Sequence, residues 1–387
     1  MRRSSAPTLH DVAREAGVSA MTVSVVINGT GSNIRVSDDT RHRIVAAASR
    51  LHYRPNAYAR GLAKRRMDTI GVVAVVDGYE VNLYFLEILN GVLEAATEHK
   101  QNTIVFSVKD WTPENLNVTQ LCDGRSDGII FIAPTLTGEF ADTLSQRHLP
   151  FVTIHSGSEL EGTFNIDVKN EEGACVLVKH LIAQGHRRIL YLSGGIQGFD
   201  AMQRLTGYRR ALAEAGIPFD DRLVVPGAYS TWSGRQRMAT LLAQHSSSPL
   251  PTAIFCGNDA VALGAMEMLA ENGIRVPEDV SVAGFDDTLT ARITTPQLTT
   301  MRQPFRQMGR RAVEVLLPQI NPRRNDNRPN GNPQGLEQEE AEGNISDVLT
   351  QKPKRNEVFD VELITRGSVG PPPTHPFNIS DHTTSRK

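Results

Sequence analysis

The chain is poor in the residues that mark a secreted, disulfide-bonded or membrane-embedded protein. It has three cysteines in 387 residues, Cys122, Cys175 and Cys256, which lie far apart and form no Cys-x-x-Cys or Cys/His spacing. No apolar run reaches the length of about 18 residues that a membrane span needs. No apolar stretch follows Arg2 and Arg3 to make a signal peptide. These gaps predict reduced cysteines, no metal or other cofactor, no membrane contact and a cytoplasmic location.

The chain also lacks the residue patterns of the common enzyme classes. No arrangement of nucleophile and base stands out, and no cluster of metal ligands. Residues 193–198 read Ser-Gly-Gly-Ile-Gln-Gly, a glycine cluster without the Gly-x-Gly-x-x-Gly spacing of a nucleotide loop. A turn between a strand and a helix explains this cluster better. We therefore expect a protein that is not an enzyme and has no catalytic residue.

Charge is distributed unevenly along the chain. The whole sequence has a formal net charge of −2, yet residues 1–66 hold twelve Lys and Arg against four acids, a net charge of about +8. Residues 67–387 therefore carry about −10. A basic segment attached to an acidic body is typical of a headpiece that binds nucleic-acid phosphates. A solvated surface is the alternative for charge alone.

A helix-turn-helix pattern occupies the basic segment from Thr8 to Asn28. Thr8 and Asp11 have the spacing of a capping box, and Gly17 can adopt the positive φ that ends a helix. Ser19 can then cap a second short helix, which in this motif lies in the major groove. A plain helical hairpin is the alternative. The side chains expected nearest the bases are Ala20, Met21, Thr22, Ser24, Val25 and Asn28.

The flanking residues extend this headpiece. Ser37 can cap a third helix from Thr40 to about His52, which has apolar residues at helical spacing. A segment from Tyr53 to Ala63 follows and leads into three consecutive basic residues. We expect a DNA-binding headpiece over residues 1–54 and a hinge helix or linker over residues 55–66.

The remainder alternates short apolar runs with helical patterns. The expected strands are 70–76, 103–108, 128–133, 151–154, 188–192, 253–256 and 280–283, with a closing strand at 361–366. The expected helices are 84–99, 115–121, 139–147, 171–184, 202–215, 233–244, 259–272 and about 305–317. Such alternation predicts parallel sheets with right-handed crossovers. Two sets of strands predict two Rossmann-like lobes with a cleft between them.

One segment does not fit a globular body. Residues 321–356 are rich in Asn, Pro, Gly, Gln and charge, with too few apolar residues to offset the entropy of ordering. We expect a disordered insertion here, with a partner-binding role as the alternative. The body is then expected over 67–320 and 357–368. The tail, 369–387, is expected to be disordered and has no heptad leucines that could form a zipper.

The headpiece resembles that of the lactose-repressor/galactose-repressor family of bacterial transcriptional regulators. The matching motifs are Thr8-Leu-x-Asp-Val-Ala, Ala16-Gly-Val-Ser, Thr22-Val-Ser and Tyr53-x-Pro-Asn-x-x-Ala-x-x-Leu. Body motifs match in the family order: Gln184-Gly-His-Arg-Arg-Ile, Arg204-x-x-Gly-Tyr, Asn258-Asp-x-x-Ala-Leu-Gly-Ala, Gly284-Phe-Asp-Asp and Pro296-x-Leu-Thr-Thr. The resemblance implies a periplasmic-binding-protein-like body that closes on a small ligand. It also implies a homodimer that binds a pseudo-palindromic, double-stranded DNA operator.

The resemblance assigns roles within the headpiece. In the family, the segment matching residues 55–63 becomes a hinge helix when two subunits meet on DNA, and a leucine matching Leu62 inserts into the minor groove. A partly buried linker residue is the alternative for Leu62. The residues assigned to DNA binding are Thr8, Ser19, Ala20, Met21, Thr22, Ser24, Val25, Asn28, Arg35, Tyr53, Asn56, Ala59 and Leu62.

Three residues of the reading helix depart from the family pattern. Val25 stands where relatives usually have Arg, and Ala20 and Met21 offer no hydrogen-bond donors to base edges. We therefore expect the outer half-site positions to be read through thymine methyl groups and DNA shape.

The resemblance also assigns an effector site. Asn258 and Asp286 follow two expected strands, where α/β sheets bind ligands, and they match ligand-gripping positions of the family. Either residue could instead cap the next helix, and Asp259 is expected to do so. A carboxylate and an amide can each pair with vicinal hydroxyls, so a sugar or polyol is the expected effector.

Further effector contacts are implied by the same likeness. Tyr84, Phe85 and Tyr229 match aromatic positions, with plain core packing as the alternative for Phe85. Glu172 matches an acidic position, although it could merely stabilise its helix. Met202 stands where many relatives have an arginine, and that loss of charge predicts a less polar or less anionic effector.

The whole pattern indicates a sequence-specific DNA-binding transcriptional regulator, a repressor, with an operator affinity that a small-molecule effector modulates. A solute-binding protein would share the body but has no use for a basic headpiece. A Rossmann-type enzyme would also share the body fold. The effector, the operator and the direction of the response are not encoded in any pattern identified in the sequence.

Overall fold

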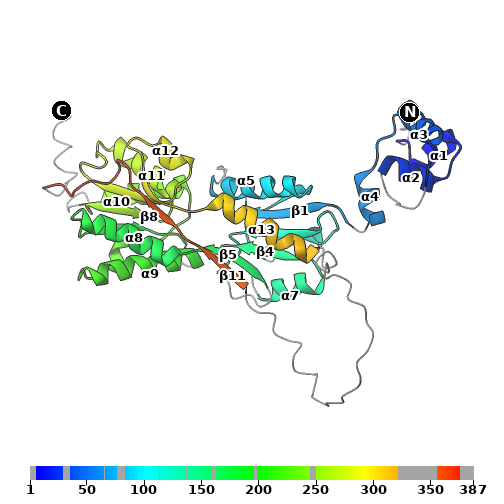
Figure 1. Ribbon diagram of the computed structural model, residues 1–387. Helices are drawn as coiled ribbons and strands as arrows, with labels where there is room; N and C mark the ends of the chain where they lie inside the picture. Colours follow the sequence, from blue (N-terminus) through cyan, green and yellow to red (C-terminus); the bar gives the residue numbers. More distant parts are fainter. Residues whose placement is uncertain are drawn as a thin grey trace, which may run out of the picture. The chain divides into compact units, whose positions relative to one another are not determined.

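The computed structural model describes residues 6–28, 35–64, 66–75, 83–112, 114–135, 138–157, 163–195, 198–244, 250–320 and 355–374. They form two compact units that divide between Thr69 and Ile70. The first unit is a small helical headpiece, and the second is a two-lobed α/β body (Figure 1). This is the expected fold class.

Four helices make up the headpiece: α1 (Leu9–Ala16), α2 (Ala20–Asn28), α3 (Asp38–Arg50) and α4 (Ala57–Lys64). Its small core consists of Val12, Ala13, Ala16, Val23, Ile44 and Ala47. The third helix begins two residues before the expected Thr40, because Ser37 caps it through a bond from the Thr40 amide. The segment expected to be a hinge is helical over α4.

Lobe 1 of the body is built on a six-stranded sheet with the order β11-β5-β4-β3-β1-β2. Its strands are β1 (Thr69–Val75), β2 (Asn102–Val108), β3 (Gly128–Ile132), β4 (Phe151–Ile154), β5 (Phe164–Val168) and β11 (Arg355–Phe359). Helices α5 (Leu83–Glu98) and α13 (Phe305–Ile320) pack on one face. Helices α6 (Val118–Leu121) and α7 (Gly138–Gln146) flank the other.

Lobe 2 has a second six-stranded sheet with the order β12-β10-β9-β8-β6-β7. Its strands are β6 (Ile189–Leu192), β7 (Val224–Val225), β8 (Ala253–Cys256), β9 (Ser281–Asp286), β10 (Thr299–Arg302) and β12 (Glu362–Ile364). Helices α8 (Asn170–Ala183) and α9 (Phe199–Glu214) cover one face, while α10 (Thr231–Gln244) and α11 (Asp259–Glu271) cover the other. Short elements η1 (Asp221–Leu223) and α12 (Leu289–Ile293) complete the lobe.

Alternating side chains of the central strands explain the three-layer packing of lobe 2. In β8, Ile254 and Cys256 face α10 and α11, whereas Ala253 and Phe255 face α8 and α9. Both sets are buried, as expected for continuous apolar strands covered on both faces. Neighbouring strands β6, β8, β9 and β10 pair in parallel, but β12 runs antiparallel to β10. The sequence predicted a parallel sheet, but the second sheet is mixed because of β12.

The chain passes between the lobes three times: at Lys169, between β5 and α8; near Gln303, between β10 and α13; and near Asp360, between β11 and β12. The parallel strands of both sheets therefore carry their carboxyl ends toward these crossovers. Direct contact between the lobes occurs at Gly157, where an added Cβ would lie 2.6 Å from Cγ of Phe199. The topology therefore determines which edge of each sheet faces the other lobe: the edge formed by the carboxyl ends of the parallel strands.

Several sequence expectations need correction. Strands β5, β7 and β10 and helix α12 were not expected, and α9 begins three residues before Met202. Arg355 and Asn356 were assigned to a disordered insertion but begin β11, which pairs in parallel register with β5. Residues 369–374, assigned to a disordered tail, are described, and the Gly370 carbonyl accepts a bond from His186 Nε2 at 2.9 Å. Strand pairing holds the first segment, and hydrogen bonds between the Gly370 backbone and the side chains of His186 and Ser281 hold the second. Composition reveals neither interaction.

Other expectations lie partly outside the described residues. These include most of the insertion, residues 321–354, and residues 375–387 of the tail. Within the described part of the chain, no helix is long and apolar enough to cross a membrane, and no cluster of potential metal ligands occurs. The three cysteines are free thiols, with Cys175 and Cys256 buried.

Candidate DNA interface and effector site

The first helix of the headpiece is fixed by the capping box that its sequence predicts. The Thr8 amide donates to Oδ2 of Asp11 at 2.9 Å, and the Asp11 amide donates back to the Thr8 hydroxyl at 3.3 Å. Gly17 ends α1 with φ at 66°, the left-handed conformation that glycine tolerates. Ser19 then accepts a bond from the Thr22 amide at 3.1 Å at the start of α2. Local chemistry therefore sets the two helices of the motif.

Helix α2 presents a mostly uncharged surface. Met21 is 65% exposed, while Thr22, Ser24, Val25 and Asn28 are partly exposed. Ala20 packs partly against the headpiece core. Asn28 donates from Nδ2 to the Ser24 hydroxyl at 3.2 Å, so two of the expected base-reading residues are linked to each other.

The remaining residues expected at DNA occupy varied positions. Arg35 is exposed, and Tyr53 is half-buried against the headpiece core. Asn56 accepts a bond from the Ala59 amide at 3.3 Å and so caps α4, on which Ala59 is exposed. Leu62 lies within α4, but its side chain is outside what the structure describes.

In the body, polar side chains gather where the carboxyl edges of the two sheets meet. The central member is Arg204 of α9, which is 3% exposed. Its Nε donates to Oδ1 of Asn170 at 2.9 Å, and its Nη1 donates to the Gly257 carbonyl at 2.6 Å. Asp200, one turn earlier, lies 3.8 Å from Nη2. The guanidinium also stacks over Phe285, 3.9 Å from the ring centroid.

Asp286 ends β9 beside this arginine and is 4% exposed. Gln303, at the second crossover, donates from Nε2 to Oδ1 of Asp286 at 2.7 Å. Burial raises the pKa of Asp286 well above its usual range, and Arg204 opposes that rise. The carboxyl of Asp286 is thus buried, bonded to Gln303 and close to Arg204.

Lobe 1 contributes Tyr84 and His155 to the same buried cluster. The Tyr84 hydroxyl lies 2.6 Å from Nδ1 of His155, and the two rings stack with centroids 5.5 Å apart. The other ring nitrogen, Nε2, is 3.8 Å from Asp167, too far for a hydrogen bond. Burial lowers the pKa of His155, although Asp167 pulls it upward. A neutral imidazole with one buried nitrogen is therefore held at the lobe boundary.

The structure brings together some of the expected effector residues. Tyr84, Tyr229, Asp286 and the backbone beside Asn258 surround the Arg204 cluster. Asn258 itself caps α11, because its Oδ1 accepts a bond from the Val261 amide at 2.9 Å. The expectation that Asp259 caps this helix is wrong, since its carboxylate instead accepts bonds from Thr288 and Thr300.

Other expected contacts lie elsewhere. Phe85 packs against the core of lobe 1, which is the plainer of the two alternatives considered for it. Glu172 is exposed on the first turn of α8, and no described contact brings it to the Arg204 cluster. Met202 is 49% exposed.

The expectation drawn from Met202 was a less polar or less anionic effector, and the structure places an arginine two residues further along the same helix. Arg204 occupies the inner face of the same helix. Gly207 marks that face, because an added Cβ there would lie 2.2 Å from the Glu171 carbonyl of α8. A residue three positions before Gly207 shares its side of a helix, whereas a residue five positions before it does not. That spacing was visible in the sequence and could have identified Arg204.

Sequence reasoning also missed His155, Asn170 and Gln303. Asn170 and Gln303 follow β5 and β10, two strands that the apolar pattern did not single out, whereas His155 follows the expected strand 151–154 and was overlooked. Oε1 of Gln303 and Nε2 of His155 are buried without a hydrogen-bond partner among the described residues. Buried polar atoms of this kind are uncommon in folded proteins and point to a ligand or to water.

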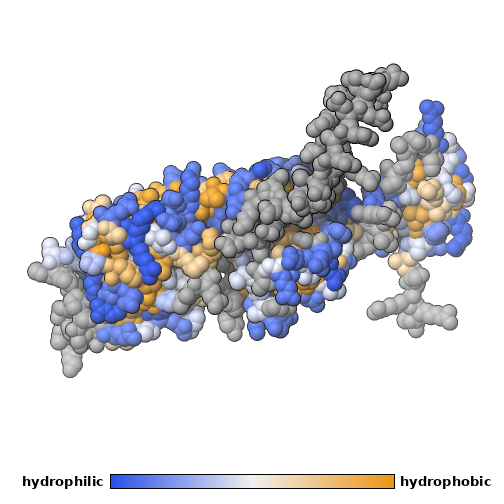
Figure 2. All heavy atoms as spheres, turned by 90° about the horizontal axis from the view of Figure 1, so that it is seen from below, coloured by the Kyte–Doolittle hydropathy of each residue, from blue (hydrophilic) through white to orange (hydrophobic). Residues whose placement is uncertain are grey.

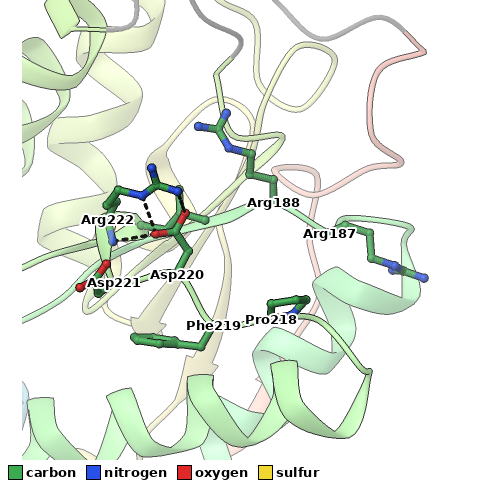
Figure 3. Close-up of a pocket in the computed structure, with 8 residues that line it drawn as sticks. Arg187, Arg188, Pro218, Phe219, Asp220, Asp221 and Arg222 are labelled. Atoms are coloured by element: carbon green, nitrogen blue, oxygen red, sulfur yellow. Dashed lines mark hydrogen bonds and ion pairs between the residues drawn. The ribbon is translucent and has the colours of Figure 1, made fainter.

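A surface groove lies at the opposite edge of lobe 2, before the first residues of β6 and β7. Arg187, Arg188, Phe219 and Leu223 line it with neighbouring residues. Figure 3 shows Asp220 bonded to Arg222 within the groove, through contacts of 2.9 Å. Asp220 and Arg222 are thus engaged with each other, and none of the residues that line the groove belongs to the Arg204 cluster.

A helix-turn-helix unit joined to a two-lobed body with a buried polar cluster between its lobes defines the class of ligand-responsive transcriptional regulators. The sequence matches two family models: bacterial regulatory proteins of the lacI family over residues 8–56, and a periplasmic binding protein-like domain over residues 178–337. The chain is 34% identical to catabolite control protein A of Priestia megaterium over 316 residues, 81% of this chain and 92% of that protein. It is 35% identical to the transcriptional repressor PurR of Vibrio parahaemolyticus, over 83% of this chain and 94% of PurR.

Solved structures agree with these sequence matches. The lac repressor dimer bound to operator and an anti-inducer superposes with a TM-score of 0.74 and 28% identity, covering 95% of this chain and all of that one. The transcriptional regulator CelR in complex with cellobiose superposes with a TM-score of 0.62 and 27% identity. The match covers 94% of this chain and 99% of CelR. The chain belongs to the LacI family of bacterial transcriptional regulators.

Proposed function

We propose that the protein represses transcription as a homodimer whose operator affinity changes when a small polar metabolite binds between the lobes of the body. The observation that carries this proposal is the buried Arg204 cluster, where both lobes place hydrogen-bonding groups at facing sheet edges. Arg204 and Asp286 come from lobe 2, and His155 comes from lobe 1. A ligand that bonds to all three ties the lobes together and favours one lobe arrangement over another.

The chemistry of the cluster supports a sugar or related metabolite as effector. Arg204 donates, Asp286 can donate or accept, and the free Oε1 of Gln303 accepts. The aromatic rings of Tyr84 and Tyr229 supply flat apolar surfaces for a sugar face or a heterocycle. Arg204, His155 and Gln303 therefore join Tyr84, Tyr229 and Asp286 in the proposed site. Cellobiose in CelR is an example of such a ligand in a relative.

For operator binding, we propose that α2 enters the major groove. Met21 is the most exposed apolar side chain of this helix and is placed to meet thymine methyl groups. Val25 flanks it, and the basic charge of the headpiece attracts phosphates. Helix α4 with Leu62 is proposed to reach the minor groove at the centre of the operator. We propose that the protein binds chromosomal operators in the bacterial cytoplasm and is not an enzyme.

Dimerisation is proposed to use the body. Apolar side chains stand exposed on lobe 2 at Trp232 of α10 and at Leu289 and Ile293 of α12, by 62%, 54% and 67%. Both helices pack beside α11. Burial against a second copy would remove this apolar area from water. Figure 2 shows apolar residues interspersed with hydrophilic ones on the face in view.

The proposal is tested with the purified full chain in two steps. Operator selection from random DNA, followed by affinity measurements at several salt concentrations, should yield a palindromic site and a steep negative salt dependence. A panel of sugars, nucleosides and purines is then screened by thermal shift, and each stabilising compound is added to the operator titration. We expect at least one compound to change operator affinity more than fivefold.

Two variants serve as controls. Deletion of residues 1–66 should abolish operator binding but keep the thermal response to the effector. Arg204→Met should keep operator binding and lose the response. A protein that binds no selected DNA would contradict the regulatory role and favour a solute-binding protein. An effector response that survives in Arg204→Met would instead place the effector outside this cleft.

A further inference from the structure

A second buried arginine lies behind the cleft, on α10. Arg237 is 8% exposed, and its guanidinium donates to four backbone carbonyls. Nη1 bonds to the Ser193 carbonyl at 2.7 Å and to the Val225 carbonyl at 2.9 Å. Nη2 bonds to the Ala228 carbonyl at 3.1 Å, and Nε bonds to the Ser233 carbonyl at 3.2 Å. Among the described residues, no carboxylate forms an ion pair with it.

This arrangement is costly unless the carbonyl cage is complete. A buried cation without a counter-charge loses its hydration, and burial lowers the pKa of Arg237. Charge-assisted bonds to carbonyl oxygens offset that loss. The acceptors come from the ends of β6 and β7, from the loop over residues 226–230, and from α10 itself. Arg237 therefore ties two separate backbone segments, the end of β6 and the stretch from Val225 to Ala228, to its own helix.

The loop held in this way carries Tyr229. The Tyr229 ring fits into a slot in which a Cβ at Gly194 would lie 2.2 Å from the ring, and one at Gly257 would lie 2.8 Å from it. On the cleft side, the Arg204 guanidinium is 5.7 Å from the ring centroid. Such close contacts mean that a small shift of the loop moves the ring out of its place beside Arg204.

We propose that Arg237 is a positioning residue: its carbonyl cage fixes the loop 226–230, so that Tyr229 forms a preorganised aromatic wall of the effector site. The functional part of this statement rests on the proposed function, because it takes the cleft as the effector site. The structural part does not, because it concerns only how firmly the loop is held. Rigid placement before binding improves affinity by lowering the ordering cost of the bound state.

The test uses hydrogen exchange of the full chain without any ligand. Arg237→Met removes all donors at similar volume, and Arg237→Lys retains a charge with fewer directed donors. Arg275→Met is the matched control, because Arg275 is an exposed arginine of the same lobe paired with Asp279. The amides to follow are Ser193, which donates to the Val225 carbonyl, and Gly234, which donates to the Ser230 carbonyl.

We expect exchange at these amides to rise at least tenfold in Arg237→Met, to rise less in Arg237→Lys, and to stay unchanged in Arg275→Met. Amides of the core strands β8 and β9 should keep their protection. Unchanged exchange at Ser193 and Gly234, whose amides donate to carbonyls at the two ends of the loop, would overturn the proposal. Equal acceleration in β8 and β9 would overturn it too, since Arg237 would then only hold the lobe together. If Arg237→Met does not fold, Arg237→Lys decides between these outcomes.

A functional readout separates this inference from the proposed function. With an effector identified by the screen, Arg237→Met should weaken effector binding about tenfold while operator affinity without effector changes less than twofold. Faster loop exchange in a protein that never responds to any compound would mean that the loop is held as inferred but the proposed function fails. Faster exchange with unchanged effector affinity would remove Tyr229 positioning as the purpose of the cage.

Discussion

The reading helix and the interlobe cleft use their side chains in opposite ways. In α2, the side chains assigned to DNA are exposed or partly exposed, and Met21 is 65% exposed. In the cleft, Arg204 and Asp286 are 3% and 4% exposed, and each is already bonded to protein groups. The helix offers a surface that neighbouring residues in the sequence create. The cleft offers a network that depends on segments far apart in the chain.

That contrast has an energetic side. The headpiece core holds six fully buried apolar residues, whereas each face of each body sheet has a larger cluster of its own. Small cores give modest stability, so local devices such as helix caps matter more in the headpiece. In the body, close packing between backbones contributes more to stability than helix caps do. The four substitutions below probe this difference, from the largest expected effect to the smallest.

Gly91→Ala should destabilise the body most. Helices α5 and α13 approach so closely that an added Cβ at Gly91 would lie 2.1 Å from the Arg306 carbonyl. Backbone cannot give way cheaply, so we expect a loss of about 3 kcal/mol of body stability in urea unfolding. Gly138→Ala is the control, since nothing lies within 4 Å of its added Cβ. If Gly138→Ala also lost stability, or if Gly91→Ala lost none, close backbone contact would not explain the effect of the substitution on the stability of the body.

Val25→Arg should change which DNA the headpiece prefers without affecting the body. A new guanidinium on α2 can donate to guanine, and one good bidentate contact discriminates between bases by about 1–3 kcal/mol. Operator selection should therefore yield a site altered at one symmetric pair of positions. Val45→Arg adds the same charge on α3, where Val45 is 55% exposed, and should leave the selected site unchanged. An identical site for Val25→Arg would refute the placement of Val25 at the bases.

Asp259→Asn should flatten the pH dependence of body stability. Burial raises the pKa of Asp259 to about 7, while hydrogen bonds from Thr300 and Thr288 oppose the rise. The folded state thus binds a proton between the ordinary carboxyl pKa and about 7 that the unfolded state does not bind. The contribution of this group is full at low pH and is lost as pH rises through 7, a decrease of about 1 kcal/mol between pH 6 and pH 8.

Urea unfolding of both proteins at pH 6 and pH 8 checks this sign, because the difference between them cancels the contributions of the histidines. Asp110→Asn, at an exposed site where bonds from Thr112 lower the pKa, should leave the slope between these pH values unaltered. A slope that persists in Asp259→Asn would assign it to another buried acid such as Asp286.

Thr8→Ala should have the smallest effect, confined to the headpiece. The substitution removes the hydroxyl that accepts from the Asp11 amide, which costs about 1 kcal/mol for a typical helix cap. Hydrogen exchange in α1 should accelerate while exchange in the body stays constant. Thr8→Ser preserves the cap and should behave like the parent. Equal exchange in α1 for Ala and Ser would mean that tertiary packing, not the cap, holds this helix.

The sequence predicted most where structure depends on local residue order. The cap at Thr8, the turn at Gly17 and the alternation of strands and helices in the body needed only short-range patterns. Strand β5 escaped because Asn165 and Asp167 interrupt its apolar pattern, although both are buried in the lobe boundary. Strand β11 escaped because its residues look polar, and only pairing with β5 makes them a strand.

The candidate site was less predictable for the same reason. The family resemblance predicted Tyr84, Tyr229 and Asp286. The residues that contact them lie on other helices and strands and were not predicted. His155 sits beside Tyr84 although 71 residues separate them, and Arg204 reaches Asn170 across 34 residues. Such pairings follow from topology, which no single stretch of sequence contains. Met202 is exposed on the outer side of α9, whereas Arg204 lies on its buried side, and only the packing of the helix distinguishes the two positions.

Both ends of the segment between Ile320 and Arg355 are anchored on lobe 1. Ile320 contacts Gly128 at the start of β3, and Arg355 pairs in register with Phe164 at the start of β5. These strand starts lie on the edge of the sheet away from the Arg204 cluster, and both belong to lobe 1. A passenger domain such as a fluorescent reporter, inserted between Ile320 and Arg355, would therefore be attached to one lobe at both of its ends. We expect such an insertion to leave the contacts between the two lobes unaltered.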